Sequence, residues 1–275
     1  MQSATLLTIA RRELREALRN RWLVFYALAF AGLAFALSLA GQASAGYSGL
    51  GGFGRTAASL VNAILLFVPL LGLSVGAGSL AGDRERGTLM YLLAQPVNRA
   101  DVFFGKALGA ALAMVVSLGL GFGLAALGLA TAGDGNPAGY LALAGNTLLL
   151  ALIALGLGFV ISALSKRVAT ALGAALILWL ILVFLGDLGL VGATLSLRPT
   201  PAVLLTMLLS NPLQVFKLSA IYNLRATLDA VGAVGQFAVY RYGDTLPVLL
   251  AALLSGWVVA TFGAAFFLFN RRGDL

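Results

Sequence analysis

Six runs of apolar residues dominate the chain, and each is long enough to cross a membrane as a helix. The hydrocarbon core of a bilayer is about 30 Å thick, and roughly 20 helical residues are needed to cross it. The runs cover residues 22–40, 57–80, 107–130, 141–164, 169–185 and 246–269. This pattern predicts an all-α integral membrane protein with six transmembrane helices, which form one domain over residues 1–275.

Residues 1–21 precede the first run and have the pattern of an amphipathic helix. Leu7, Leu14, Ala17 and Leu18 fall on one face at helical spacing, and charged residues fill the other face. These charged residues are Arg11, Arg12, Arg15, Glu16 and Arg19. We expect the helix to lie in the inner interface of the membrane. Two interpretations stay open, a simple anchor for the first span and an elbow helix that moves with a partner.

Residues 82–106 connect the second and third runs on one side of the membrane. Charged residues come first, with Asp83 and Glu85 next to Arg84 and Arg86. After Gly87, the apolar residues Leu89, Leu92 and Leu93 predict a short amphipathic helix, because a solvated loop would not need them. Either these leucines pack on the helix ends of this chain, or the helix docks onto a cytosolic subunit.

Residues 186–245 precede the last run and are too long for a passive connector. Asn211 can cap a helix and Pro212 suits its first turn. The following helix has two faces, an apolar one with Leu213, Phe216, Ala220 and Leu224, and a polar one with Gln214, Lys217 and Arg225. Residues 201–209 are apolar but too short to span. We therefore expect amphipathic helices outside the membrane, forming a lid or a re-entrant element.

Composition and charge support the membrane interpretation. Hydrophobic residues make up 60% of the chain and charged residues only 10%, which is too few to cover a soluble domain. The formal net charge of +8 comes from basic residues that flank the apolar runs, so we expect no nucleic-acid partner. Thirteen of the 18 Lys and Arg residues lie on one side. The positive-inside rule places that side, with both termini, in the cytoplasm, as in a bacterial inner membrane protein.

The chemistry that the chain lacks excludes several classes of function. With no Cys and no His, it has no thiol nucleophile, no imidazole base and none of the usual zinc or copper(II) sites, so no metal site is expected. The Gly-x-x-x-x-Gly-Lys-Ser/Thr motif of nucleotide-binding loops is absent. The six runs contain no Asp, Glu, Lys or Arg, which disfavours an ion-coupled carrier. We expect no catalytic site and no cofactor in this chain.

Glycines recur at helical spacing inside the runs, as Gly72 with Gly76, and Gly119 with Gly123. Small residues four apart let two helix backbones approach closely. The pattern does not decide between packing within the chain and a seam between two copies.

The segment between the second and third runs resembles the corresponding segment of type-2 ABC exporter permeases. The residues that carry the resemblance are Asp83, Glu85, Gly87, Thr88, Leu89, Leu92, Leu93, Pro96, Val97, Arg99, Gly105 and Lys106. The resemblance implies a homodimer that works with a separate cytosolic ATPase, which carries the ATP and Mg. It also implies that residues 82–106 couple the two proteins. The implied coupling residues are Asp83, Glu85, Arg86, Gly87, Thr88, Leu89, Leu92, Leu93, Pro96 and Arg99.

Residues 210–218 carry a narrower resemblance, to the permease subunits that serve copper-site maturation of nitrous oxide reductase. It implies a periplasmic accessory protein as an outer partner, which contacts Asn211, Pro212, Leu213, Gln214, Phe216 and Lys217. Two other functions stay open. One is an exporter of a lipid, a drug or a polysaccharide, and the other is a membrane anchor that only holds a partner complex.

The predicted topology can be tested by cysteine labelling, because the chain has no Cys of its own. We expect cysteines placed at Arg86 and Lys166 to react only from the cytoplasm, and Lys217→Cys to react only from outside. Labelling of Lys217→Cys from the cytoplasm alone would overturn the topology.

Overall fold

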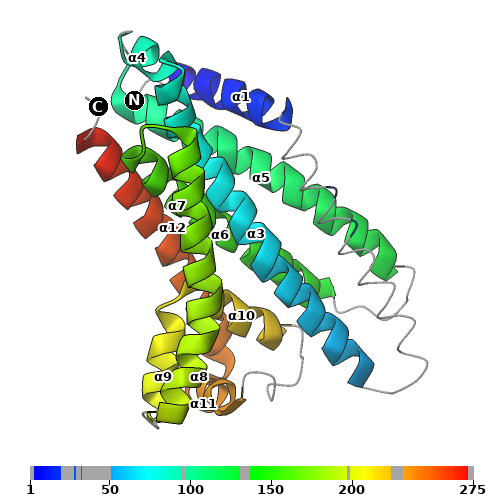
Figure 1. The fold of residues 1–275 in the computed structure, drawn as a ribbon. Helices are drawn as coiled ribbons and strands as arrows, with labels where there is room; N and C mark the ends of the chain where they lie inside the picture. The colour runs from blue at the N-terminus through cyan, green and yellow to red at the C-terminus, as the bar shows by residue number, and fades with distance from the viewer. Residues whose placement is uncertain are drawn as a thin grey trace.

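The computed structural model describes residues 3–19, 28, 32, 51–94, 97–130, 137–196, 199–223 and 232–271, and every regular element in these ranges is a helix. Figure 1 shows the arrangement. The elements are α1 (Ser3–Arg19), α3 (Gly51–Glu85), α4 (Thr88–Leu93), α5 (Arg99–Ala130), α6 (Pro137–Leu164), α7 (Val168–Leu180), the π-helix η1 (Ile181–Leu185), α8 (Gly186–Ser196), α9 (Pro201–Leu209), α10 (Pro212–Asn223), α11 (Gly232–Tyr242), the 3-10 helix η3 (Gly243–Thr245) and α12 (Leu246–Arg271).

Five helical stretches of the described residues are long and apolar enough to cross a membrane. They are Val61–Glu85, Arg99–Leu124, Ala138–Leu164, Val168–Leu195 and Val234–Arg271. These stretches overlap the second to sixth predicted runs, whereas the first predicted run, residues 22–40, lies almost entirely outside the described residues. The helices α9 and α10 meet at a bend of 109° and together would pass the same test, as a broken span or a re-entrant loop.

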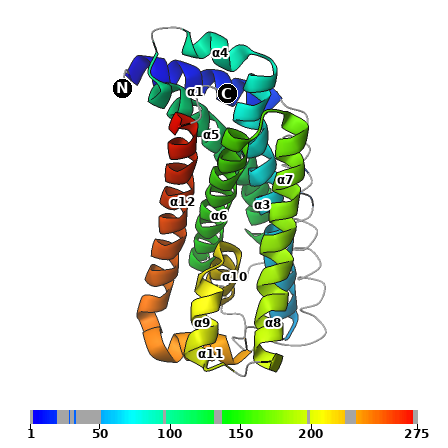
Figure 2. The same ribbon diagram turned by 60° about the vertical axis from the view of Figure 1, so that its left-hand side comes forward.

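Different elements lie at the two ends of the bundle. At one end are α1, α4 and the C-terminal end of α12, and at the other are α8, α9 and α11 (Figures 1 and 2). The helix α1 lies across its end of the bundle rather than along it (Figure 2). The chain therefore begins and ends on the same side, which agrees with the even number of spans predicted from the sequence.

The closest helix contact in the bundle joins α3 to α6. A Cβ atom at Gly72 would lie 2.7 Å from the Ala154 Cβ, and one at Gly76 would lie 2.9 Å from the Gly158 Cα. Nearer the end of the bundle that carries α1 and α4, the hydroxyl of Ser162 on α6 forms hydrogen bonds with the backbone of α3. It donates to the Ala77 carbonyl (2.7 Å) and accepts from the Ala81 N–H (2.8 Å). Gly72 and Gly76 thus pack within the chain, which decides the question that their spacing left open.

An aromatic cluster fills the space between α5, α6 and α12. Phe103 is fully buried, and its ring centre lies 5.6 Å from that of Phe159 and 5.7 Å from that of Phe269. Phe266 completes the cluster at 5.4 Å from Phe103. Aromatic pairs at these separations attract each other beyond the effect of buried area alone, so the cluster fixes how α12 closes the bundle.

Two helix boundaries differ from the hydropathy pattern. The helix α3 continues to Glu85 and α5 begins at Arg99, so most of the predicted connection 82–106 is helical. Asp83, Asp101 and Lys106 consequently lie on helices that pass the span test, and all three are buried. The apolar runs contain no charged residue, but the helices that include these runs do. Hydropathy marks only the apolar part of a helix, and polar ends continue it when neighbouring helices supply hydrogen bonds.

The fifth span is also longer than its apolar run. The helix continues from α7 through the π-helix η1 into α8, so the stretch Val168–Leu195 is one span. The first residues of the predicted outer segment 186–245 therefore belong to this span. A π-helical turn adds one residue per turn without ending the helix, and hydropathy alone does not detect it.

The α3–α6 contact predicts opposite effects of the same substitution at two glycines of α3. Gly76→Ala should lower the thermal midpoint of the purified protein by several degrees, a cost of about 1–3 kcal/mol, because the methyl group meets the backbone of α6. Gly78→Ala is the matched control, since no described atom lies within 4 Å of its Cβ position. It should be neutral or slightly stabilising. Tryptophan fluorescence reports the transition through Trp179, which donates to the Leu66 carbonyl of α3. Equal midpoints for the two variants would contradict this packing.

Candidate functional site

The first candidate site lies at the end of the bundle that carries α1 and α4. Most of its charged residues are in the last turn of α3 and just after it. We call residues 83–94, together with Lys106 of α5, the coupling corner. The carboxylate of Asp83 is buried and accepts from Lys106 Nζ (2.7 Å) and from the Arg86 guanidinium (3.0 Å). The backbone carbonyl of Asp83 accepts a hydrogen bond from the Thr88 hydroxyl (3.2 Å). One residue thus links α3 to α5 and to the first turn of α4.

Lys106 is the most buried basic side chain of the described residues, at 2% exposed. It pairs with Asp83 and also with Glu13 of α1. A charge in such a position must be paired, because its desolvation costs several kcal/mol. Next to it on α5, Gly105 lets α1 approach closely, since a Cβ there would lie 2.9 Å from the Ile9 Cβ. Gly105 and Lys106 therefore form the part of α5 against which α1 packs.

Arg84 and Glu85 hold the connection between α6 and α7. The Arg84 guanidinium donates to the carbonyls of Ser162 (3.2 Å) and Ser165, at the C-terminal end of α6. The Glu85 carboxylate accepts from the Val168 N–H (2.8 Å), at the N-terminal end of α7. A cation at a helix C-terminus and an anion at a helix N-terminus both complement the helix dipole. Movement of the end of α3 therefore moves both helix ends.

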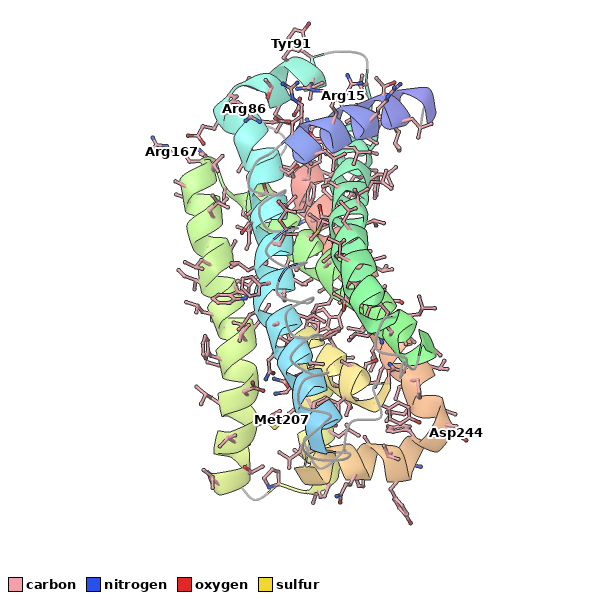
Figure 3. All side chains as sticks on the ribbon, turned by 90° about the vertical axis from the view of Figure 1, so that its right-hand side faces the viewer. Arg15, Arg86, Tyr91, Arg167, Met207 and Asp244 are labelled. Atoms are coloured by element: carbon pink, nitrogen blue, oxygen red, sulfur yellow. The ribbon has the colours of Figure 1, made fainter. Side chains whose placement is uncertain are left out.

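The helix α4 presents a different apolar face from the one expected. Leu89 is buried against its own chain, as the first of the two interpretations of the leucines expects. The exposed residues are Met90 and Tyr91, at 77% and 71%, and Figure 3 shows Tyr91 pointing away from the bundle. Leu92 is half-buried. Gly87, before α4, has a φ of 73°, a conformation that favours glycine. The sharp turn that it makes aims Met90 and Tyr91 outward.

The other predicted coupling residues are placed as follows. Thr88 and Arg99 are half-buried, and Arg99 donates to the Asn270 carbonyl of α12 (3.3 Å). The side chain of Leu93, and the whole of Pro96, lie outside the described residues. Of the two interpretations of the leucines, packing on this chain applies to Leu89.

At the opposite end, Asn211 ties α10 to the π-helix. Its side-chain oxygen accepts from the Leu213 N–H (2.9 Å), which is the predicted cap of α10. Its side-chain amide donates to the Leu182 carbonyl in η1 (2.9 Å). A π-helical turn disturbs the backbone ladder and is often found at functional sites. The Asn211 amide gives one carbonyl of this turn a partner.

Gln214 and Lys217 add a second link between α10 and α8. Both donate to the Asp187 carboxylate, at 2.8 and 3.0 Å. Gly186 makes room for them, because a Cβ there would lie 2.7 Å from Gln214 Nε2 and 2.6 Å from Asn211 Nδ2. We call Asn211, Gln214 and Lys217, with Asp187 and Leu182, the outer anchor.

The helix α10 is not an amphipathic surface helix, which corrects the prediction. Its buried residues include Pro212, Leu213, Gln214 and Phe216, and of the six predicted contacts only Asn211 and Lys217 are partly exposed. The helix lies in the bundle beside α6 and α12, as Figure 2 shows. A further buried bond runs from Asn146 of α6 to Ser219 of α10 (2.7 Å). Leu224 and Arg225, the other predicted face residues, lie outside the described residues.

Sequence reasoning missed Glu13, Ser162 and the role of Asp187. Glu13 had a detectable signal, because it is an acid three to four residues from Ala10 and Ala17, on the side of α1 that packs inward. Ser162 had none, since a serine in an apolar run does not reveal which backbone it bonds to. Asp187 was visible only as an acid near the end of a run.

Comparison with known proteins covers almost the whole chain. Residues 7–274 match the model of the family described as ABC-2 family transporter protein. A protein of Pseudomonas aeruginosa, named "Probable ABC transporter permease protein NosY", is 35% identical to this chain over 96% of the chain and 98% of the relative. A protein of the same name from Stutzerimonas stutzeri is 33% identical, over 96% of this chain and 97% of the relative.

The ion cluster of the coupling corner predicts the effect of removing its cation. Lys106→Met should lower the free energy of unfolding by about 3–5 kcal/mol, because the Asp83 carboxylate stays buried without its lysine. Adding Asp83→Asn should restore part of the loss. The control Lys217→Met breaks a partly exposed pair and should cost about 1 kcal/mol or less. Detergent-stability assays compare the three variants, and a Lys106→Met protein as stable as the Lys217→Met protein would contradict the buried cluster.

Proposed function

This chain belongs to the ABC-2 family of transporter proteins, and from that premise we propose that it couples a separate cytosolic ATPase to a periplasmic partner. The proposed task is copper-site maturation of nitrous oxide reductase, in the bacterial inner membrane. The family supplies the membrane component of a transporter and works with an ABC ATPase. The narrower task rests on the name NosY of both relatives and on the resemblance of residues 210–218.

The exposed face of α4 is the observation that carries this proposal. Met90 and Tyr91 are large apolar side chains exposed at the end of the bundle, on a helix that the turn at Gly87 projects outward. Central apolar and aromatic anchors usually contribute most of the energy of a protein interface. Glu85 and Arg86 are exposed beside them as a charged rim. We propose that the ATPase receives Met90 and Tyr91 in a groove.

Movement of α4 would then pass along the fifth span. Arg84 and Glu85 hold the ends of α6 and α7 to the end of α3. From there α7, η1 and α8 continue as one span to the other end of the bundle. The outer anchor joins that span to α10 through the Leu182 carbonyl and Asp187. A movement of α4 at the coupling corner would therefore reorient the bent pair α9–α10.

We propose that the periplasmic partner responds to this reorientation of α9 and α10 and does not contact α10 directly. Leu213, Gln214 and Phe216 are buried, so their proposed role is to hold the bent pair in register. The exposed residues at that end include Leu195, Val203 and Tyr240. A second copy of the chain is part of the proposal, by resemblance to the family. The stretch Val168–Leu195 has little of its surface covered within the chain, which leaves room for that copy or for lipid.

A tyrosine at each end of the molecule provides the test. Tyr91→Asp should release the ATPase during purification, a loss of about 2 kcal/mol or more in binding, because a charge replaces an apolar anchor. Tyr240→Asp is the matched control, since Tyr240 is 90% exposed on α11 at the opposite end. It should leave the ATPase attached. Cells with Tyr91→Asp should also produce nitrous oxide reductase without its full copper complement.

The same purification separates the other functions. An ATPase that stays bound to the Tyr91→Asp protein would place the docking site elsewhere. An ATPase that co-purifies without any periplasmic protein would favour the exporter. A periplasmic protein whose attachment does not respond to ATP would favour the membrane anchor.

A further inference from the structure

The outward face of α1 carries an unusual combination of exposed side chains. Leu7, Arg11, Arg15 and Leu18 follow one another at helical spacing along one stripe, and all four are exposed. Figure 3 shows Arg15 pointing away from the bundle. The sequence placed both leucines on the apolar face of the helix with Leu14 and Ala17, and in the structure Leu7 is 61% exposed and Leu18 is 40% exposed. The packed face instead contains Ala10 and Glu13, against α5.

The charge on this face has no counterpart within the described part of the chain. The helix has two acids, of which Glu13 pairs with Lys106 and Glu16 pairs with Arg12 (2.8 Å). No described residue pairs with Arg11, Arg15 or Arg19. The outward face is therefore cationic, and it carries leucines at both ends of the cationic stripe.

The position of α1 determines what can cover this face. The helix packs on Gly105 and Gly109, within the first three turns of the span Arg99–Leu124. It lies across the end of the bundle at that level (Figure 2). A cationic helix with a leucine at each end of its cationic stripe, lying in the plane of the interface, binds anionic phospholipid, because the leucines enter the acyl boundary and the arginines meet phosphate. An acidic protein surface would fit the arginines but would leave Leu7 and Leu18 in water.

We propose that Arg11, Arg15 and Arg19 of α1 form a binding surface for anionic phospholipid headgroups of the inner leaflet, and that this lipid regulates the coupling corner. The second part rests on the proposed function. Glu13 lies on the opposite side of the same helix and pairs with Lys106, which also pairs with Asp83. A lipid that holds α1 in place would hold Lys106, and through Asp83 the start of α4. Anionic lipid should therefore set how readily the ATPase moves the corner.

Lipid binding is measured on the permease alone, by native mass spectrometry in detergent with added phosphatidylglycerol or phosphatidylcholine. The native protein should retain phosphatidylglycerol in preference to phosphatidylcholine. The double variant Arg11→Gln/Arg15→Gln should bind phosphatidylglycerol about 25-fold more weakly, since each arginine near an anionic surface contributes roughly fivefold in affinity. The control Lys166→Gln/Arg167→Gln removes two charges at the same end of the bundle and should bind as the native protein does. Equal binding of the two lipids, or an equal loss in the control, would overturn the lipid surface.

Regulation is measured on the complex with the ATPase, in nanodiscs that contain either lipid. Phosphatidylglycerol should change the rate of ATP hydrolysis at least twofold in the native complex, and the Arg11→Gln/Arg15→Gln complex should not respond. Glu13→Gln should still bind phosphatidylglycerol but lose the response, while Lys106 keeps its pair with Asp83. A full response in Glu13→Gln would refute the proposed route. Failure of any ATPase to associate would refute the proposed function, and the lipid-binding result would stand by itself.

Discussion

A lysine buried at the end of a membrane bundle must be neutralised, and this requirement organises the coupling corner. Lys106 has two acidic partners, Asp83 from α3 and Glu13 from α1, and the three helices meet where these side chains meet. Removing any one charge would leave another buried without its full complement, which is costly in a low dielectric. The helices therefore cannot shift independently. The interaction couples α1 to the segment that leads into α4.

The polar residues of this protein mainly join helices to one another. Arg84 and Glu85 cap α6 and α7, Ser162 enters the backbone ladder of α3, and Asn211 supplies a partner to the π-helical turn. Backbone groups inside hydrocarbon have no water to bond to, so each irregular turn needs a side chain from a neighbouring helix. This explains why the polar residues gather at the coupling corner and at the outer anchor. The long helices between these sites can then transmit movement as stiff elements.

Much of the fold could be predicted, whereas the assignment of faces could not. Five of the six predicted runs coincide with helices of the described residues, and the cap at Asn211 occurs at the position that its residue type indicated. The predictions failed where a face had to be chosen. Leu89 and Leu92 look alike in the sequence, yet one is buried and the other half-buried, while Met90 and Tyr91 are exposed. Likewise Gln214 and Lys217 indicated a polar outer face of α10, but both donate to Asp187 of α8.

The sequence by itself determined that this is a multi-pass helical membrane protein, and it marked two candidate functional segments along the chain. Hydropathy and motif spacing are local properties, and the thickness of the bilayer converts them directly into spans. Only the tertiary structure decided which polar side chains meet: Lys106 with Glu13 across 93 residues, and Asn211 with the carbonyl of Leu182. In a membrane helix a charged residue near an end can face water, lipid headgroups or another helix, and all three have the same local pattern. The packing of the neighbouring helices selects among them, because it sets where a buried charge can find its partner.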